Sequence, residues 1–127
     1  MAISYNIDVG QRCVFVKLDG ETNEWDIGIA LQQLWQDSRL DPSFSRFVDG
    51  TGAIPTSNPG NFIKAVADDT RRRKKPIGKI AFVASSELVH NHFRMYEARA
   101  QREQCQIFRD KFEALSWLGV HEPESMA

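Results

Sequence analysis

Segments with two different spacings of apolar residues alternate along this chain. Residues 3–8 alternate apolar and polar positions, and residues 12–18 are rich in β-branched and aromatic side chains, which is typical of strands. The short Val9–Gln11 segment between them predicts an antiparallel hairpin. Three further strands are expected at 44–49, 77–84 and 104–108, where apolar runs are bounded by polar or turn-forming residues.

Four other segments place apolar residues three and four positions apart, the spacing of a helix that buries one face. The first spans 24–37, with Thr22 or Asn23 as its cap, and the second runs from Pro59 to about Arg73. A third follows Ser85 or Ser86 and turns Val89, Phe93, Tyr96 and Ala100 inward. Asp110 caps the last, which is expected to turn Phe112, Leu115 and Leu118 toward the core.

The resulting order, β-β-α-β-α-β-α-β-α, predicts an α/β fold. A hairpin followed by βα units favours one mixed five-stranded sheet, mostly parallel, with helices packed on it. The length of 127 residues suits one domain, which we place at residues 1–120. Residues 121–127 are expected to form a flexible C-terminal tail.

Charge and cysteine content narrow the function classes. The 16 basic and 17 acidic side chains leave a net charge of −1, and much of the positive charge lies in the run Arg71–Lys75, so a nucleic-acid partner is not expected. No apolar run approaches the roughly 20 residues of a membrane span, and the N-terminus carries no secretory pattern. Cys13 and Cys105 are expected to be reduced thiols. Together with the lack of an apolar span and of a secretory pattern, this predicts a cytoplasmic protein.

Four segments of the second half carry a family resemblance. They are Lys79–Leu88, Arg94–Ala98, Ile107–Asp110 and Ala114–Leu118, and together they resemble the C-terminal half of the SpoIIAA-like proteins. These bacterial STAS-like domains are related in fold to anti-anti-sigma factors and to the lipid-binding Sec14 group. The resemblance implies a compact α/β domain with a mixed sheet of about five strands, and it implies no catalytic set.

The segment after the third expected strand is a candidate regulatory site. In anti-anti-sigma factors a Ser or Thr at the start of the following helix is phosphorylated, although the usual Asp-Ser-Ser-Gly pattern is replaced here by Asp49-Gly50-Thr51-Gly52. Exposed N–H groups at a helix start also favour an anion or small ligand. The candidate binding residues are Thr51, Gly52, Thr56, Ser57 and Asn58, with a plain helix cap as the alternative.

Trp25 and Ile29 are a candidate partner surface. At 100° per residue both fall on the side of the first helix that is opposite Ile27 and away from the core. Large apolar residues one turn apart on an outer face suggest docking of a protein partner or self-association, for instance as a homodimer. The alternative is that Trp25 precedes the helix or folds over its start.

The sequence offers little support for catalysis. It shows no Ser-His-Asp order, no Cys-His pair and no twin carboxylates, and His90 and His92 lie two apart on a helix, where they cannot share a metal ion. We therefore expect no cofactor and no metal. The favoured interpretation is a non-enzymatic STAS-like regulatory or protein-interaction domain. The alternative is a small-molecule or lipid-binding module of Sec14-like type, with a surface groove more than an enclosed cavity because the chain is short.

Overall fold

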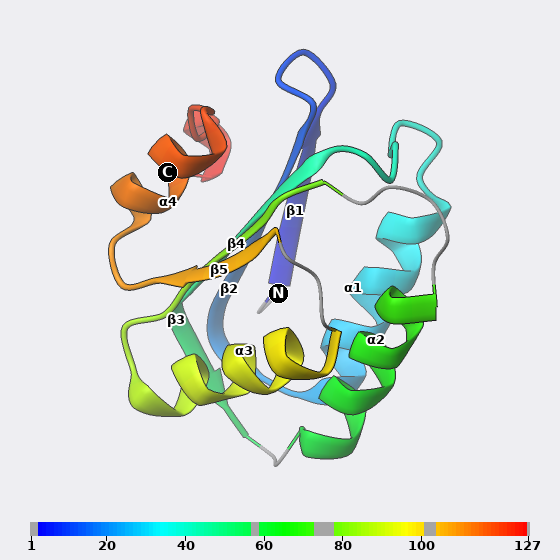
Figure 1. Cartoon of the computed structure of the whole chain (residues 1–127), viewed down its shortest axis with the longest axis vertical. Coiled ribbons are helices and arrows are strands. Elements are labelled where there is room, and N and C mark those ends of the chain that lie inside the picture. Colours follow the sequence, from blue (N-terminus) through cyan, green and yellow to red (C-terminus); the bar gives the residue numbers. More distant parts are fainter. Residues whose placement is uncertain (1–2, 57–58, 73–77, 101–103, 127) are drawn as a thin grey trace.

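A computed structural model describes residues 3–56, 59–72, 78–100 and 104–126 of the chain (Figure 1). Its elements are β1 (Ile3–Asp8), β2 (Cys13–Thr22), α1 (Glu24–Gln36), β3 (Ser45–Pro55), α2 (Gly60–Arg72), β4 (Ile80–Val83), α3 (Glu87–Ala100), β5 (Cys105–Phe108), α4 (Lys111–Leu118) and the short 3-10 helix η1 (Glu124–Met126). The order expected from the hydrophobic pattern is confirmed. None of the helices in these described ranges is long and apolar enough to cross a lipid bilayer.

The five strands form one mixed sheet in the order β1-β2-β3-β4-β5. β1 and β2 are the antiparallel hairpin, in which Ile7 faces Val14 across the ladder. The remaining neighbours pair in parallel. An α/β fold with a mixed five-stranded sheet is therefore present, as the element order predicts.

Alternation along the strands divides the core into two clusters, one on each face of the sheet. Phe15, Phe47 and Val83 point to one face, which α4 covers, and we call this the α4 face. Val16 and Leu18 point to the other face, which α1, α2 and α3 cover, and we call this the three-helix face (Figure 1). Because each strand residue alternates sides, one strand serves both clusters.

Local capping fixes where three of the helices begin. The Asn23 side chain accepts a hydrogen bond from the Asp26 N–H at 2.9 Å, and the Asp110 side chain accepts one from Phe112 N–H at 2.8 Å. Ser86 Oγ accepts from the Val89 N–H at 3.2 Å. Each side chain satisfies an N–H that a helix start leaves unpaired, as the sequence predicts.

β2 and β3 extend well beyond their expected ends. The expected end of the third strand at residue 49 is wrong, because β3 continues to Pro55 and pairs with β2 as far as Thr22. Two close approaches account for the glycines there. A Cβ on Gly52 would collide with the Asp19 carboxylate, and one on Gly50 would meet the Phe93 ring at 2.8 Å. Close packing in an extended strand thus favours glycine at both positions, most strongly at Gly50, where the Val83 main-chain carbonyl would also lie 3.1 Å from a Cβ.

The expected inward position of Phe112 is also wrong, since its side chain is 71% exposed. The buried residues of α4 are Ala114 and Leu115, and Trp117 and Leu118 pack beside them. At 100° per residue, Phe112 lies about 120° from the centre of that face. Only Lys111 approaches the ring among the contacts described, with its Nζ 5.7 Å from the centroid.

The C-terminal residues are packed and do not form the expected flexible tail. Gln11 donates to the His121 carbonyl at 2.8 Å and accepts from the His121 N–H at 2.7 Å. Lys111 pairs with Glu122 at 3.0 Å. Met126 is only 8% exposed and belongs to the cluster on the α4 face. The segment from 121 to 126 therefore acts as a second cover for this face, beside the short helix α4.

Candidate functional site

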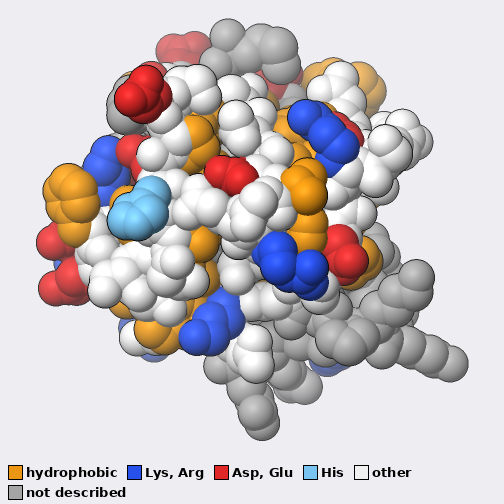
Figure 2. Space-filling view, turned by 90° about the horizontal axis from the view of Figure 1, so that it is seen from above, with side chains coloured by type: hydrophobic (Ala, Val, Ile, Leu, Met, Phe, Trp, Pro, Cys, Tyr) orange, Lys and Arg blue, Asp and Glu red, His pale blue; other side chains and the backbone are white. Residues whose placement is uncertain are grey.

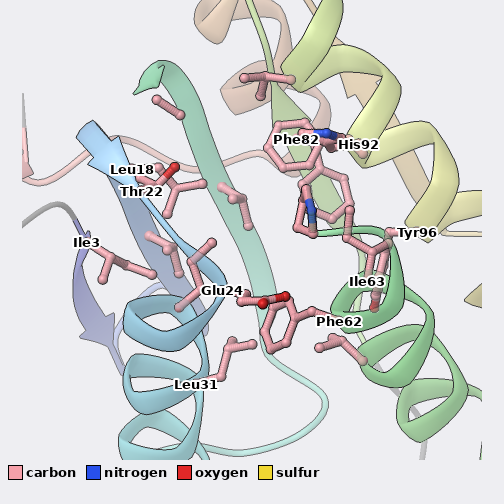
Figure 3. Close-up of a pocket in the computed structure, with 18 of the residues that line it drawn as sticks. Ile3, Leu18, Thr22, Glu24, Leu31, Phe62, Ile63, Phe82, His92 and Tyr96 are labelled. Carbon is pink, nitrogen blue, oxygen red and sulfur yellow. The ribbon is translucent and has the colours of Figure 1, made fainter. Parts of the chain in front are cut away.

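A cavity of about 190 Å³ lies between the sheet and the helices of the three-helix face (Figure 3). Its lining is mostly apolar and comes from β1 to β4 and from α1, α2 and α3. For comparison, an engineered apolar cavity of about 150 Å³ stays dry and binds benzene. The cavity is therefore large enough for a small organic molecule.

The cavity exists because α2 packs along α3 more than onto the sheet. Asp68 of α2 accepts two hydrogen bonds from the Arg99 guanidinium of α3, at 2.8 and 3.1 Å. Ala67, a small residue, is fully buried and suits a close helix approach. On the other side, the Phe62 ring lies over Gly28 of α1, where a Cβ would be 3.6 Å from the ring. The apolar side of α2 is thus held above the sheet.

One wall of the cavity is aliphatic. It is formed by β1, β2 and α1, and Figure 3 shows Ile3, Leu18 and Leu31 on this side, across the cavity from α2 and α3. Leu34 of α1 is buried at its edge. These residues are the inner positions of the amphipathic first helix and of the hairpin.

The opposite wall is aromatic. The Phe82 and Phe93 rings stack with centroids 4.4 Å apart, and Tyr96 meets Phe82 edge-on at 5.5 Å. Phe62 of α2 adds a fourth ring to the lining. Aromatic pairs favour these offset and edge-on arrangements, so this wall has a defined shape.

A few polar side chains also line the cavity. Glu24 lies at the start of α1 and Arg46 lies near its end, where the guanidinium carbon is 4.4 Å from the centre of the Trp35 ring. Figure 3 shows the Glu24 carboxylate beside the Phe62 ring. His92 lies on α3, and burial lowers the pKa of this imidazole below its ordinary value of 6.5.

The residues predicted to form a binding loop lie elsewhere. Thr51 is in β3, and both its N–H and its Oγ1 donate to Asp49 Oδ1, at 3.0 and 2.7 Å. The buried Asp49 carboxylate would repel an anion placed there. The Thr56 Oγ1 donates to the Thr22 carbonyl at 3.1 Å. Gly52 is in contact with Asp19, and Ser57 and Asn58 lie outside the described residues.

The two residues predicted to form a partner surface are on the outer side of α1. Trp25 is 74% exposed and Ile29 is 39% exposed, so both are accessible as expected. A role in docking stays a prediction. On the face seen in Figure 2, charged side chains of both signs lie among separate apolar ones, without one dominant apolar patch.

The structure also gives the surroundings of the two cysteines, of the possible metal ligands and of the basic run. Burial raises the pKa of both Cys13 and Cys105 to about 12, so neither thiol is a ready nucleophile. Across the described ranges, no cluster of His, Cys, Asp and Glu side chains could hold a metal ion. From the basic run, Arg71 pairs with Asp68 at 3.4 Å, while residues 73–75 lie outside the described part of the chain.

The sequence did not predict this cavity, although one signal in it was consistent with a polar lining. His92 and Tyr96 lie on the inner side of α3, next to Val89 and Phe93. This side of the helix, expected to be apolar, therefore carries two side chains that end in polar groups. Such groups need a hydrogen-bonding partner when they are buried. The distance between α2 and the sheet depends on tertiary packing, which has no periodic pattern in the sequence.

Comparison with known proteins leaves the site without an assignment. No family model matches the chain, and a search of curated proteins found no matching relative. The cavity therefore has to be interpreted from its own geometry.

Proposed function

We propose that this protein is a non-catalytic binding module that holds a small, largely apolar molecule in the cavity of the three-helix face. The observation that carries the proposal is the cavity itself: about 190 Å³, walled by aliphatic and aromatic side chains. Concave, mostly apolar sites with a few polar groups are the usual form of small-molecule sites. This interpretation follows the alternative raised from the sequence, a small-molecule or lipid-binding module, and assigns its binding site to the three-helix face.

The size of the cavity sets the affinity to expect. A ligand the size of an aromatic side chain buries roughly 150 Å² or more. At about 25 cal/mol per Å² this contributes roughly 4 kcal/mol before the costs of association. Because association costs act against this gain, a minimal one-ring probe should bind with a Kd no tighter than about the millimolar range, and a natural ligand with added polar contacts should bind more tightly.

The lining suits retention of a molecule better than its chemical conversion. The charged side chains of the lining are Glu24, at the start of α1, and Arg46, which lies against the Trp35 ring near the end of that helix. His92 has aromatic and aliphatic neighbours in the cavity. We therefore extend the expectation of a non-enzymatic domain to this site.

Filling the cavity tests the proposal. Leu31→Trp adds volume on the cavity wall, whereas Gln33→Trp adds the same side chain at an exposed position of the same helix. Ligand-observed NMR with toluene should show binding to the wild-type protein and to Gln33→Trp, and a loss of at least about tenfold with Leu31→Trp. The proposal fails if the wild type does not bind toluene, or if Leu31→Trp binds it as well as Gln33→Trp does.

We also propose that the fold is of the SpoIIAA-like, STAS-like type and that the protein is a bacterial cytoplasmic one. The support is the resemblance of the four segments in the second half, together with a hairpin that leads into parallel βα units. A ligand-binding role agrees with what that resemblance implies about the Sec14 group.

A second candidate function is docking of a protein partner or a second copy through Trp25 and Ile29. The exposure of both residues, one helical turn apart on the outer side of α1, favours it, because adjacent exposed apolar side chains are a feature of interaction surfaces. Light scattering on the wild type and on the Trp25→Ala, Ile29→Ala double variant tests self-association. A wild-type mass above that of one chain should fall to it in the variant. If the wild type is already monomeric, and the double variant captures the same protein partners as the wild type, docking through this surface is wrong.

A further inference from the structure

The polar groups of the cavity are few, and they limit the ligand. The charged groups are Glu24 at the start of α1 and Arg46, which lies against Trp35 near the end of that helix. The Nε and Nη2 atoms of Arg46 are shielded from solvent. Figure 3 shows His92 next to Phe82 of the aromatic wall.

His92 is suited to hydrogen bonding with a ligand. Its side chain is half-buried on α3, one helical turn before Tyr96, and burial keeps the pKa of the imidazole below the ordinary value of 6.5. Burial thus favours the neutral ring, which has one nitrogen that donates and one that accepts. It can pair with a hydroxyl, an amide or a carbonyl group.

We propose, resting on the binding function above, that the cavity takes an uncharged molecule with one aromatic ring and one hydrogen-bonding group, and that this group pairs with His92. The ring lies against the wall of Phe82, Phe93 and Tyr96. The aliphatic wall covers its other side.

The aromatic wall accounts for the ring. The Phe82–Phe93 stack and the edge-on Tyr96 present both ring faces and ring edges to the cavity. A ligand ring can add to this arrangement in the same offset or edge-on geometry. A flexible alkyl chain would fill the space without matching these orientations and would lose more conformational entropy on binding.

The lack of charge follows from desolvation. A carboxylate or ammonium group beside His92 would leave water for a neutral, mostly apolar surrounding, which is strongly unfavourable without a charged partner. Arg46 lies against the Trp35 ring, and Figure 3 shows the Glu24 carboxylate beside Phe62 and away from His92. A neutral hydroxyl loses less hydration and regains a hydrogen bond from His92.

Four probes of the same ring size separate these contributions. Toluene is apolar, benzyl alcohol is neutral with one hydroxyl, benzoate is an anion, and benzylamine is a cation at pH 7.5. Measured by ligand-observed NMR on the full chain, benzoate and benzylamine should each bind at least about tenfold more weakly than benzyl alcohol.

His92→Phe tests the pairing residue, and His90→Phe is the matched control on the same helix. Benzyl alcohol should bind about fivefold or more weakly to His92→Phe, because its hydroxyl loses its partner. Toluene should bind both variants as it binds the wild type, to within about threefold. His90→Phe should change neither probe.

The outcomes distinguish the two proposals. If toluene does not bind the wild type, the binding function itself is wrong. If toluene binds but benzoate binds as tightly as benzyl alcohol, the uncharged class is wrong and Arg46 becomes the recognition group. If benzylamine binds as tightly as benzyl alcohol, Glu24 is the recognition group. If His92→Phe leaves benzyl alcohol unchanged, the role of His92 is overturned while the binding function stands.

Discussion

Met126→Ala should destabilise the protein although the residue lies almost at the end of the chain. Its side chain is 8% exposed and packs in the cluster that covers the α4 face. Truncating a buried methionine to alanine costs about 2–5 kcal/mol, depending on how far the site can collapse. The short helix η1 can partly relax, so we expect the lower end, about 2 kcal/mol.

Urea denaturation measures this cost. For a chain of this size, m is typically about 1–3 kcal/mol/M, so the transition midpoint should fall by about 1 M. Met95→Ala is the matched control, because Met95 is an exposed methionine on α3 and its loss should change stability by less than about 0.5 kcal/mol. If Met126→Ala unfolds at the same urea concentration as Met95→Ala, the C-terminal segment does not pack as described.

Four further predictions test other parts of the structure. Gly78→Ala should destabilise by roughly 2–3 kcal/mol in urea denaturation, because its Cβ would press on the main-chain carbonyls of residues 43 and 44. Gly28→Ala should instead stabilise by about 1 kcal/mol, since its Cβ meets Phe62 at an ordinary 3.6 Å and helix propensity improves; a loss of stability would show that the Phe62 contact is tighter. Iodoacetamide at pH 8 should label Cys13 and Cys105 slowly in the folded protein and rapidly in urea, because burial raises their pKa to about 12, and rapid labelling without urea would contradict this. Stability should fall as the pH drops below 6.5, since the unfolded chain protonates His92 more readily than the folded one, and His92→Gln should flatten this part of the curve.

The element order was predictable because it depends on local patterns. The hairpin of β1 and β2 shows as alternation, and the helix starts show as capping residues such as Asn23 and Asp110. Each signal is encoded within a few neighbouring residues.

The predictions from sequence fail where the structure depends on contacts between residues that are far apart in the chain. β3 reaches Pro55 because β2 lies beside it and Gly52 admits Asp19, which no local pattern reveals. Met126 is buried because α4 is too short to cover its face alone. The cavity likewise depends on the distance at which α2 is held from the sheet.

The central claim concerns where a ligand binds, and methyl-labelled NMR measures this directly. On addition of toluene, the methyl signals of Ile3, Leu18, Leu31 and Ile63 should shift, because these residues line the cavity. The methyl signals of Leu115, in the cluster on the α4 face, should stay in place. Shifts centred on Leu115, or no shifts at the four cavity residues at saturating toluene, would contradict the account.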